Sequence, residues 1–395
     1  MVFKKWRLFL FFRNFLFISF LKAMSNTISE GYIKEYYNKF FPLDAIKEWI
    51  QYGGKEPLDR RECAYWFDSQ RFNRWASIND MRRILDNLTL SPPERMEIGP
   101  VYTYPLKERN SVQLGTFYAV HRELVFDIDS DDFKDIKDCC GDSEICPRCW
   151  RYMCCALECL IKALTENFGF KYILPVYSGR RGVHIWVCDD KARELSQKVR
   201  EGIVNYLNIN EIVNSPNFQH ITDCPFAQQM LQTCERYFIQ IAEEYSIFTN
   251  PKLVDKVKGV VGEEVYNKIM TRFTEYGNQS FEAQWNAIKE KPLIQGAKKR
   301  FDETLSYYRL IFHFSFPRLD ANVTITMNHL LKSPFSYHPK SGLLSLPIPL
   351  DKFDQFPPSW VPKLVDLIDD NPDARNAYDN ALKQFEEFKD SVINS

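Results

Sequence analysis

The feature that most constrains the fold is an apolar stretch, Leu124 to Ile128, that carries two aspartates, Asp127 and Asp129, at its end. The apolar residues predict a buried β-strand, and the side chains of a strand alternate between its two faces. The two carboxylates therefore point the same way and repel each other unless a cation joins them. Paired hard oxygen ligands suit Mg²⁺ or Mn²⁺, the ions of phosphate chemistry. The alternative is a solvated strand end that runs into the acidic turn Ser130–Asp132.

Composition narrows the classes of protein that remain. The chain has 395 residues, of which 45% are hydrophobic and 26% charged, enough for one large domain or two to three ordinary ones. The formal net charge of −1 excludes a uniformly basic nucleic-acid-binding protein, so any polyanion must be held by a local patch. Seven of the 11 cysteines lie between residues 139 and 159, which indicates a reducing compartment with one local metal site.

The first 23 residues differ from the rest, because they are apolar and basic with no acidic residue. Three interpretations remain open: a signal anchor, an organelle presequence, or a start codon set too early, with Met24 as the true first residue. We favour Met24, since an ordinary amphipathic helix follows it. A membrane-bound protein is not expected.

Hydrophobic periodicity predicts an α/β fold with a mixed β-sheet flanked by helices. The predicted helices span residues 26–52, 76–90 and 152–168. The predicted strands span residues 101–108, 114–120, 122–129, 171–177, 183–188, 306–316 and 343–348. We expect a catalytic core in two parts, 24–190 and 301–362, interrupted by a helical subdomain at 191–300 and followed by an acidic helical tail at 363–395.

A cysteine-rich loop at residues 138–150 predicts a structural zinc site. Its four cysteines are Cys139, Cys140, Cys146 and Cys149. The spacing from Cys146 to Cys149 lets two thiolates grip one ion, and the adjacent pair completes a tetrahedral shell. The alternative is a set of packed free thiols, which is how we interpret Cys154, Cys155 and Cys159 on the next helix.

The turn from Ser178 to His184 combines a hydroxyl, two guanidinium groups, two glycines and an imidazole. Arginine forks match phosphate oxygens, and glycines let the backbone approach an anion closely. We therefore predict anion binding by Arg180 and Arg181. A solvated basic hairpin is the alternative, but it does not account for His184 at the start of an apolar strand.

A third cluster contains His329, Lys332 and His338 in a segment rich in serine and proline. We expect His329 and Lys332 to share one face of a helix that Pro334 ends. Histidines beside lysine in such turns favour phosphate binding. Upstream, Asp320 is expected at the end of the predicted strand 306–316, where it would supply the third carboxylate of a two-metal site.

These motifs together resemble the small, catalytic subunit of eukaryotic-type (archaeo-eukaryotic) DNA primase. The similar pieces occur in the family's order over roughly residues 29–350, and they are Glu123–Asp129, the cysteine loop, Val176–His184 with Trp186–Asp189, Pro317–Asp320, and His329–Ser336 with His338. The first 23 residues have no counterpart.

The resemblance implies a primase-type core that synthesises short RNA primers on single-stranded DNA by two-metal nucleotidyl transfer. It implies two Mg²⁺ or Mn²⁺ ions on Asp127, Asp129 and Asp320, and one zinc ion on the four loop cysteines. The implied contacts to a ribonucleoside triphosphate are Ser178, Arg180, Arg181, His184, His329, Lys332, His338, Glu62 and Arg74. It also implies a primase large subunit, the DNA polymerase alpha complex, an RNA primer product and a nuclear location.

Two rival functions use part of the same pattern. A metal-dependent nuclease could use the carboxylates but has no need for a triphosphate-sized set of cationic side chains. A non-catalytic, zinc-containing nucleic-acid-binding protein could use the basic turns, but paired carboxylates would repel its ligand. Metal-dependent nucleotide incorporation separates the three functions.

Overall fold

The computed structural model describes residues 28–68, 71–87, 91–140, 145–209, 213, 218, 221, 224–290 and 297–395. The expectations for residues 1–23 lie outside this range. Within it, we find no helix of sufficient length and apolarity to span a bilayer.

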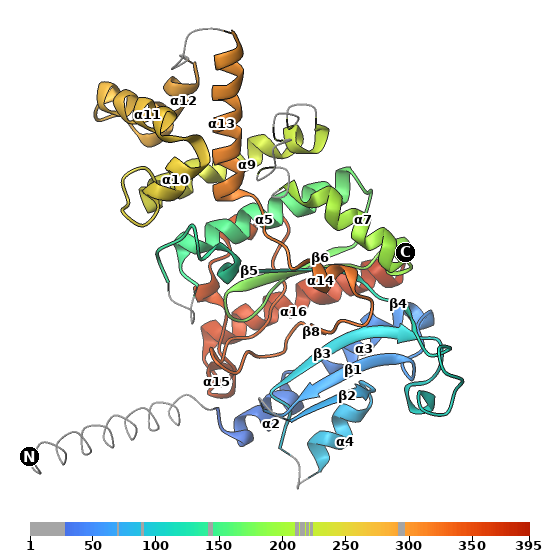
Figure 1. Ribbon diagram of the computed structural model, residues 1–395. Coiled ribbons are helices and arrows are strands. Elements are labelled where there is room, and N and C mark those ends of the chain that lie inside the picture. The colour runs from blue at the N-terminus through green and yellow to red at the C-terminus, as the bar shows by residue number, and fades with distance from the viewer. Residues whose placement is uncertain are drawn as a thin grey trace, which may run out of the picture.

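Strands form two antiparallel sheets in the described chain (Figure 1). The five-stranded sheet has the order β2-β1-β3-β4, with β8 paired to β3. Its strands are β1 (Arg61–Trp66), β2 (Phe72–Ala76), β3 (Arg95–Tyr102), β4 (Ala119–His121) and β8 (Leu331–Lys332). The three-stranded sheet has the order β5-β7-β6. Its strands are β5 (Leu124–Asp129), β6 (Ile173–Tyr177) and β7 (Gly182–Val187). The combination of helices and strands is as expected, but a single mixed sheet is wrong.

Helices surround both sheets. The N-terminal and middle α-helices are α2 (Glu30–Lys39), α3 (Leu43–Gln51), α4 (Asp80–Asp86), α5 (Pro147–Glu166), α6 (Asp190–Arg193), α7 (Gln197–Leu207) and α9 (Pro225–Tyr245). The later ones are α10 (Val254–Val261), α11 (Glu263–Tyr276), α12 (Phe281–Glu290), α13 (Ala297–Ser315), α14 (Ala321–Ile325), α15 (Leu364–Ile368) and α16 (Pro372–Ile393). Short 3₁₀ turns span Tyr52–Gly54, Leu106–Glu108, Ser130–Phe133, Phe353–Gln355 and Pro358–Trp360.

The helices α9 to α13 stand together beyond α5, away from both sheets (Figure 1). They join the rest of the molecule where α9 packs along α5. The last helix of the chain, α16, packs against α3 from the N-terminal part. Trp49 of α3 contacts both Trp186 of β7 and Phe385 of α16, with ring centroids 5.4 and 5.5 Å apart. The C-terminal segment is therefore part of the hydrophobic core, although the sequence indicated only an acidic tail.

Several predicted elements are wrong in type or extent. The expected strand 306–316 belongs to helix α13, because Tyr307, Leu310, Ile311 and Phe314 recur at helical spacing and are buried. Helix 26–52 is broken at Pro42, whose ring cannot continue a helix. Residues 343–348 make isolated bridges to other segments instead of a strand.

Other predicted elements are right in place but wrong in extent. The expected helix 76–90 is reduced to α4, the expected strand 101–108 becomes the end of β3 followed by a 3₁₀ turn, and little of 114–120 is strand. Turns that hydrogen-bond to distant backbone, such as Thr103 N to Tyr118 O at 3.0 Å, replace the extended runs there. By contrast, β5, β6, β7 and α5 lie close to their expected positions.

Candidate active site

The two aspartates lie on β5, which pairs with β7. Asp127 lies opposite His184 in the register, and Asp129 lies opposite Gly182. His184 Nε2 is 3.6 Å from Asp127 Oδ1. Ile128, between the aspartates, is fully buried on the other face of the sheet. The alternation expected from sequence is therefore present, and it directs both carboxylates to one side.

The surroundings of Asp127 disfavour the charged form of its carboxyl group. Burial, followed by the charges of Asp129 and Asp320, raises the pKa of Asp127 to about 7. Burial lowers the pKa of the neighbouring His184 to about 3, so this imidazole is neutral at physiological pH and does not compensate the carboxylate. Burial and the neighbouring aspartates both disfavour the charged form of this carboxyl group, and a bound divalent cation would offset both effects.

Arg181 joins the acidic strand to the basic turn. Its Nε lies 2.9 Å from Asp129 Oδ1, and its guanidinium also contacts Asp131 Oδ2 at 2.5 Å. The Arg181 side chain is only 14% exposed. The alternative of a solvated basic hairpin does not describe this residue, since its guanidinium is held against the carboxylate strand, and anion binding by Arg180 and Arg181 stays a prediction.

Glycines shape the turn between β6 and β7. Gly179 has a φ of +83°, and a Cβ there would lie 3.0 Å from the carbonyl oxygen of Leu343. A Cβ at Gly182 would lie 2.4 Å from the carbonyl oxygen of Ile128 on β5. Ser178 Oγ accepts a hydrogen bond from the Gly182 amide at 3.1 Å and closes the turn. Only glycine allows this close approach of backbones.

Lys332 connects the two sheets. It lies on β8, opposite Glu97 of β3, and its ammonium group donates to the Ser178 carbonyl. Burial, and then the charge of Arg95, lowers the pKa of Lys332 to about 7. The expected helix through His329 and Lys332 is wrong: Lys332 is in a strand, and the strand directs it toward the β6–β7 turn.

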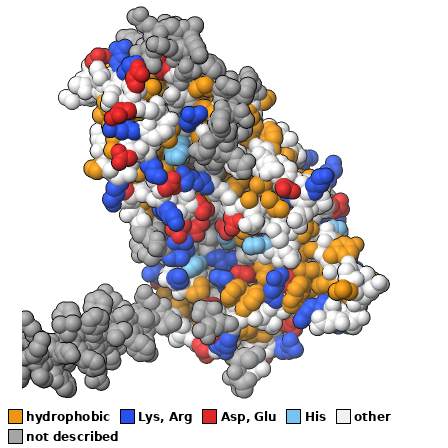
Figure 2. All heavy atoms as spheres, in the orientation of Figure 1, with side chains coloured by type: hydrophobic (Ala, Val, Ile, Leu, Met, Phe, Trp, Pro, Cys, Tyr) orange, Lys and Arg blue, Asp and Glu red, His pale blue; other side chains and the backbone are white. Residues whose placement is uncertain are grey.

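These groups line one open cavity of about 290 Å³ between the sheets. The lining residues are Arg95, Glu97, Asp127, Asp129, Ser178, Arg180, Arg181, Gly182, His184, His329, Leu330, Leu331, Lys332 and His338. In Figure 2, acidic, basic and histidine side chains meet in a hollow across the middle of the molecule. Burial, and then Lys332, lowers the pKa of His338 to about 3, so this imidazole is also neutral.

Arg95 and Glu97 are lining residues that sequence reasoning missed. They lie two positions apart on β3, and Arg95 Nη2 is 3.0 Å from Glu97 Oε1. The alternation of Arg95, Glu97 and the intervening Met96 was visible in the sequence as a strand pattern. Nothing in the sequence indicated that this strand lies beside the carboxylates.

Asp320 lies beside the cavity without lining it. It caps the N-terminus of α14, where its Oδ1 accepts from the Asn322 amide at 3.0 Å, instead of ending a strand. Its backbone amide donates to the Asp127 carbonyl at 3.2 Å. Within the described residues, the three aspartates do not form a group whose ligand oxygens all lie within 4.8 Å of one another. The backbones are adjacent, and the Asp320 side chain faces its helix.

Glu62 and Arg74 form a pair next to the same cavity. Arg74 Nε is 2.7 Å from the fully buried Glu62, and Arg74 also donates to the Asn328 carbonyl at 2.9 Å. The pair therefore contacts the segment that carries His329. Neither Glu62 nor Arg74 lines the cavity.

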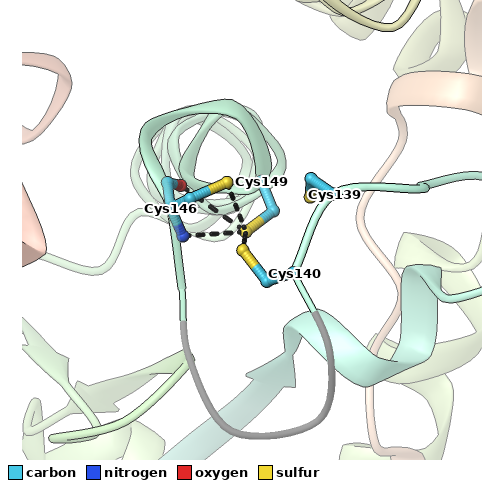
Figure 3. Close-up of side chains that lie close together, drawn as sticks. All are labelled: Cys139, Cys140, Cys146 and Cys149. Atoms are coloured by element: carbon cyan, nitrogen blue, oxygen red, sulfur yellow. Dashed lines mark hydrogen bonds between the residues drawn. The ribbon is translucent and has the colours of Figure 1, made fainter.

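The four loop cysteines come together as the sequence indicated (Figure 3). Cys149 is central, with its Sγ 3.6 Å from the Sγ atoms of Cys140 and Cys146. The sulfurs of a tetrahedral zinc–thiolate site with bonds of about 2.3 Å are separated by roughly 3.8 Å. Cys139 stands to one side, 2.9 Å from the Tyr245 hydroxyl. The donor set and its spacing fit zinc.

A family model described as DNA primase small subunit matches residues 126–350, more than half of the chain. The chain belongs to the DNA primase small subunit family. The resemblance found in the motifs is thereby confirmed, and the match covers the two aspartates of β5, the basic turn and the segment with His338.

Curated relatives extend the similarity over most of the chain. The DNA primase small subunit of Drosophila melanogaster is 30% identical over 92% of this chain and 86% of its own length. The one from Schizosaccharomyces pombe is 29% identical, over 88% and 79% respectively. The archaeal DNA primase small subunit PriS of Thermococcus kodakarensis is 26% identical, over 81% and 88%. The similarity thus includes both eukaryotic and archaeal primase small subunits.

Proposed function

We propose that this chain is the catalytic subunit of a DNA primase, which joins ribonucleotides into short RNA primers on single-stranded DNA. The observation that carries the proposal is the cavity itself, where Asp127 and Asp129 face Arg180, Arg181 and Lys332. A nuclease requires the acidic side alone. The cationic side is suited to the polyphosphate of a nucleoside triphosphate, and family membership supports the same activity.

The acidic side fits Mg²⁺ or Mn²⁺. Its donors are carboxylate oxygens, which hard divalent cations prefer. Burial, and then the charges of Asp129 and Asp320, raise the pKa of Asp127, so its charged form needs a counter-charge. Two such cations on Asp127, Asp129 and Asp320 would acidify a 3′-hydroxyl and neutralise the triphosphate. Asp320 would reach them by turning its side chain from the α14 cap, while its backbone stays beside Asp127.

The other residues of the cavity bind and orient the substrate. Arg180 and Arg181 supply forked donors for phosphate oxygens, and Lys332 supplies a compact charge from the opposite sheet. His184 and His338 are neutral, so they hydrogen-bond to phosphate or sugar without adding charge. His329 and the pair Glu62–Arg74 extend this binding surface toward the nucleoside. Fixed donors around the triphosphate stabilise the charge that develops in phosphoryl transfer.

The cysteine loop is proposed to hold one structural zinc ion on Cys139, Cys140, Cys146 and Cys149. Four thiolates fill the coordination shell, which leaves no position for substrate. We also propose a division into a core of two parts, expected at 24–190 and 301–362, and a helical subdomain, expected at 191–300, which α13 extends to Ser315. The loop lies at the N-terminus of α5, the helix on which that subdomain packs.

A small subunit implies a partner subunit. We propose that the partner is the primase large subunit, within the complex of DNA polymerase alpha, and that both act in the nucleus. The weak net charge of this chain supports the assignment, because a partner would then supply much of the affinity for template and primer.

The test is de novo synthesis of oligoribonucleotides on a single-stranded DNA template, by the chain alone and with a large subunit. Replacing Asp127→Asn or Asp129→Asn should reduce synthesis by at least about a thousandfold, since either change removes a metal-binding charge. The fold should persist, because both side chains are partly exposed.

The matched control is Asp44→Asn on α3, whose side chain is 76% exposed. It should leave synthesis unchanged. Retained synthesis in either cavity variant, or template degradation without extension in the wild type, would exclude the proposed function.

A further inference from the structure

A second cysteine cluster lies where α5 meets α9. Cys155 and Cys159 are four residues apart on α5, and Cys234 faces them from α9. The three Sγ atoms all lie within 4.8 Å of one another, and those of Cys159 and Cys234 are 3.7 Å apart. Each residue is at most 1% exposed. The sequence indicated packed thiols for the first two and gave no sign of the third.

The spacing of these sulfurs is that of ligands sharing one atom. At roughly the 2.3 Å of a zinc–thiolate bond, three sulfurs around one centre lie within about 4 Å of one another. The pair at 3.7 Å is as close as the 3.6 Å pairs of the zinc-type loop. No fourth cysteine, histidine or carboxylate joins this group in the described part of the chain. The cluster therefore offers three sulfur ligands, whereas the loop offers four.

The charge of the three thiolates decides which kind of ion this cysteine cluster can bind. Three thiolates carry three negative charges, and the fully buried position penalises any net charge that remains. The carboxylate of Glu158 acts on Cys159 and Cys234, but it is paired with Arg236, so the thiolates themselves are the charge that a ligand must neutralise. A monovalent or divalent ion would leave the complex anionic, whereas a trivalent thiophilic centre leaves it neutral.

We propose that Cys155, Cys159 and Cys234 form a binding site for trivalent arsenic, independent of primer synthesis. Arsenous acid, As(OH)₃, reacts with the three thiols so that three As–O bonds break and three As–S bonds form. Each thiol proton leaves in one of three water molecules, and no atom is oxidised or reduced. The product links α5 to α9 and therefore fixes the helices α9 to α13 on the rest of the molecule.

The experiment uses the full chain, first loaded with one equivalent of zinc. Arsenite is added, with long incubation because buried thiols react only through transient opening. After gel filtration, arsenic and zinc are measured per chain. We expect one arsenic with full retention of zinc, an arsenic X-ray absorption spectrum with three sulfur neighbours, and a higher midpoint of thermal unfolding. Arsenic gained at the expense of zinc would assign the binding to the loop cysteines and overturn the proposal.

Variants locate the site. Cys234→Ser should weaken arsenite retention by at least roughly tenfold, about 1.4 kcal/mol. Cys154→Ser is the matched control, since this buried thiol on α5 contacts the Phe353 carbonyl and lies outside the cluster. Equal retention in Cys234→Ser and wild type would contradict the proposal. Should Cys234→Ser fail to fold, Cys159→Ser replaces it, and absence of sulfur neighbours in the wild-type spectrum remains decisive.

Discussion

Arg181 is the residue at which the acidic and basic sides of the cavity meet. Its guanidinium contacts Asp129 and Asp131 through different nitrogens, while its place in the turn after β6 brings it to the proposed triphosphate. A lysine would keep the charge but could not reproduce the fork. Replacing Arg181 by lysine therefore tests the geometry of the side chain separately from its charge.

Arg181→Lys should reduce the apparent affinity for nucleoside triphosphates by roughly 10- to 100-fold, the loss of about 1.5–3 kcal/mol in charge-assisted hydrogen bonds. Steady-state primer synthesis at varied nucleotide concentration measures it. Arg375→Lys, which alters an exposed pair with Asp379 on α16, is the control and should have no effect. Unchanged affinity in Arg181→Lys would remove this residue from the nucleotide site.

His121, at the end of β4, belongs to a charge network with the buried residues Glu56 and Arg193. Its Nδ1 is 3.0 Å from Glu56, which also pairs with Arg193. The hydrogen bond to Glu56 raises the pKa of His121 above its usual 6.5. The folded state therefore holds the proton more tightly, so the stabilisation is complete below pH 6.5 and is lost as the pH rises through the raised pKa.

Urea unfolding of wild type and His121→Gln from about pH 5.5 to 8.5 measures this effect. The stability advantage of the wild type should be largest at the acidic end and should shrink toward the alkaline end. The advantage should disappear in a Glu56→Gln background. A difference that grows with pH would contradict the assignment.

At the scale of elements, the β5–β7 pair holds the site through close backbone contact at Gly182. Gly182→Ala should destabilise the protein by about 1–3 kcal/mol, because the added Cβ meets the Ile128 carbonyl. Gly259→Ala on α10 is the matched control, since its Cβ meets nothing within 4 Å. It should be neutral or stabilise by up to about 1 kcal/mol. Thermal unfolding compares them, and equal midpoints would refute the contact.

The elements differ in how well the sequence could predict them. The strand β5, the turn after β6 and the helix α5 were predictable, because each depends on short-range pattern: alternation, glycines or helical spacing. The run 306–316 was misread as a strand because its aromatic residues favour strands, although its buried residues recur at the helical spacing with which α13 packs against α9. Asp320 was identified as a carboxylate that follows an apolar run, but its position beside Asp127 depends on a backbone contact between distant segments.

At the scale of the whole molecule, the cavity exists because two sheets meet. One sheet supplies the aspartates and the arginine turn, and the other supplies Arg95 and Lys332. Local sequence pattern carries no information on how two sheets face each other, which is why Arg95 was missed. The short strand β8 is the element that unites them, as Lys332 lies on it and bonds to Ser178.

The most direct measurement is a crystal structure of the wild-type chain with Mn²⁺ and a non-hydrolysable ribonucleoside triphosphate, with manganese located by anomalous scattering. We predict manganese on Asp127 and Asp129, Asp320 turned toward it, and the triphosphate on Arg180, Arg181 and Lys332. Manganese bound elsewhere, or a triphosphate that contacts none of these cationic residues, would contradict it.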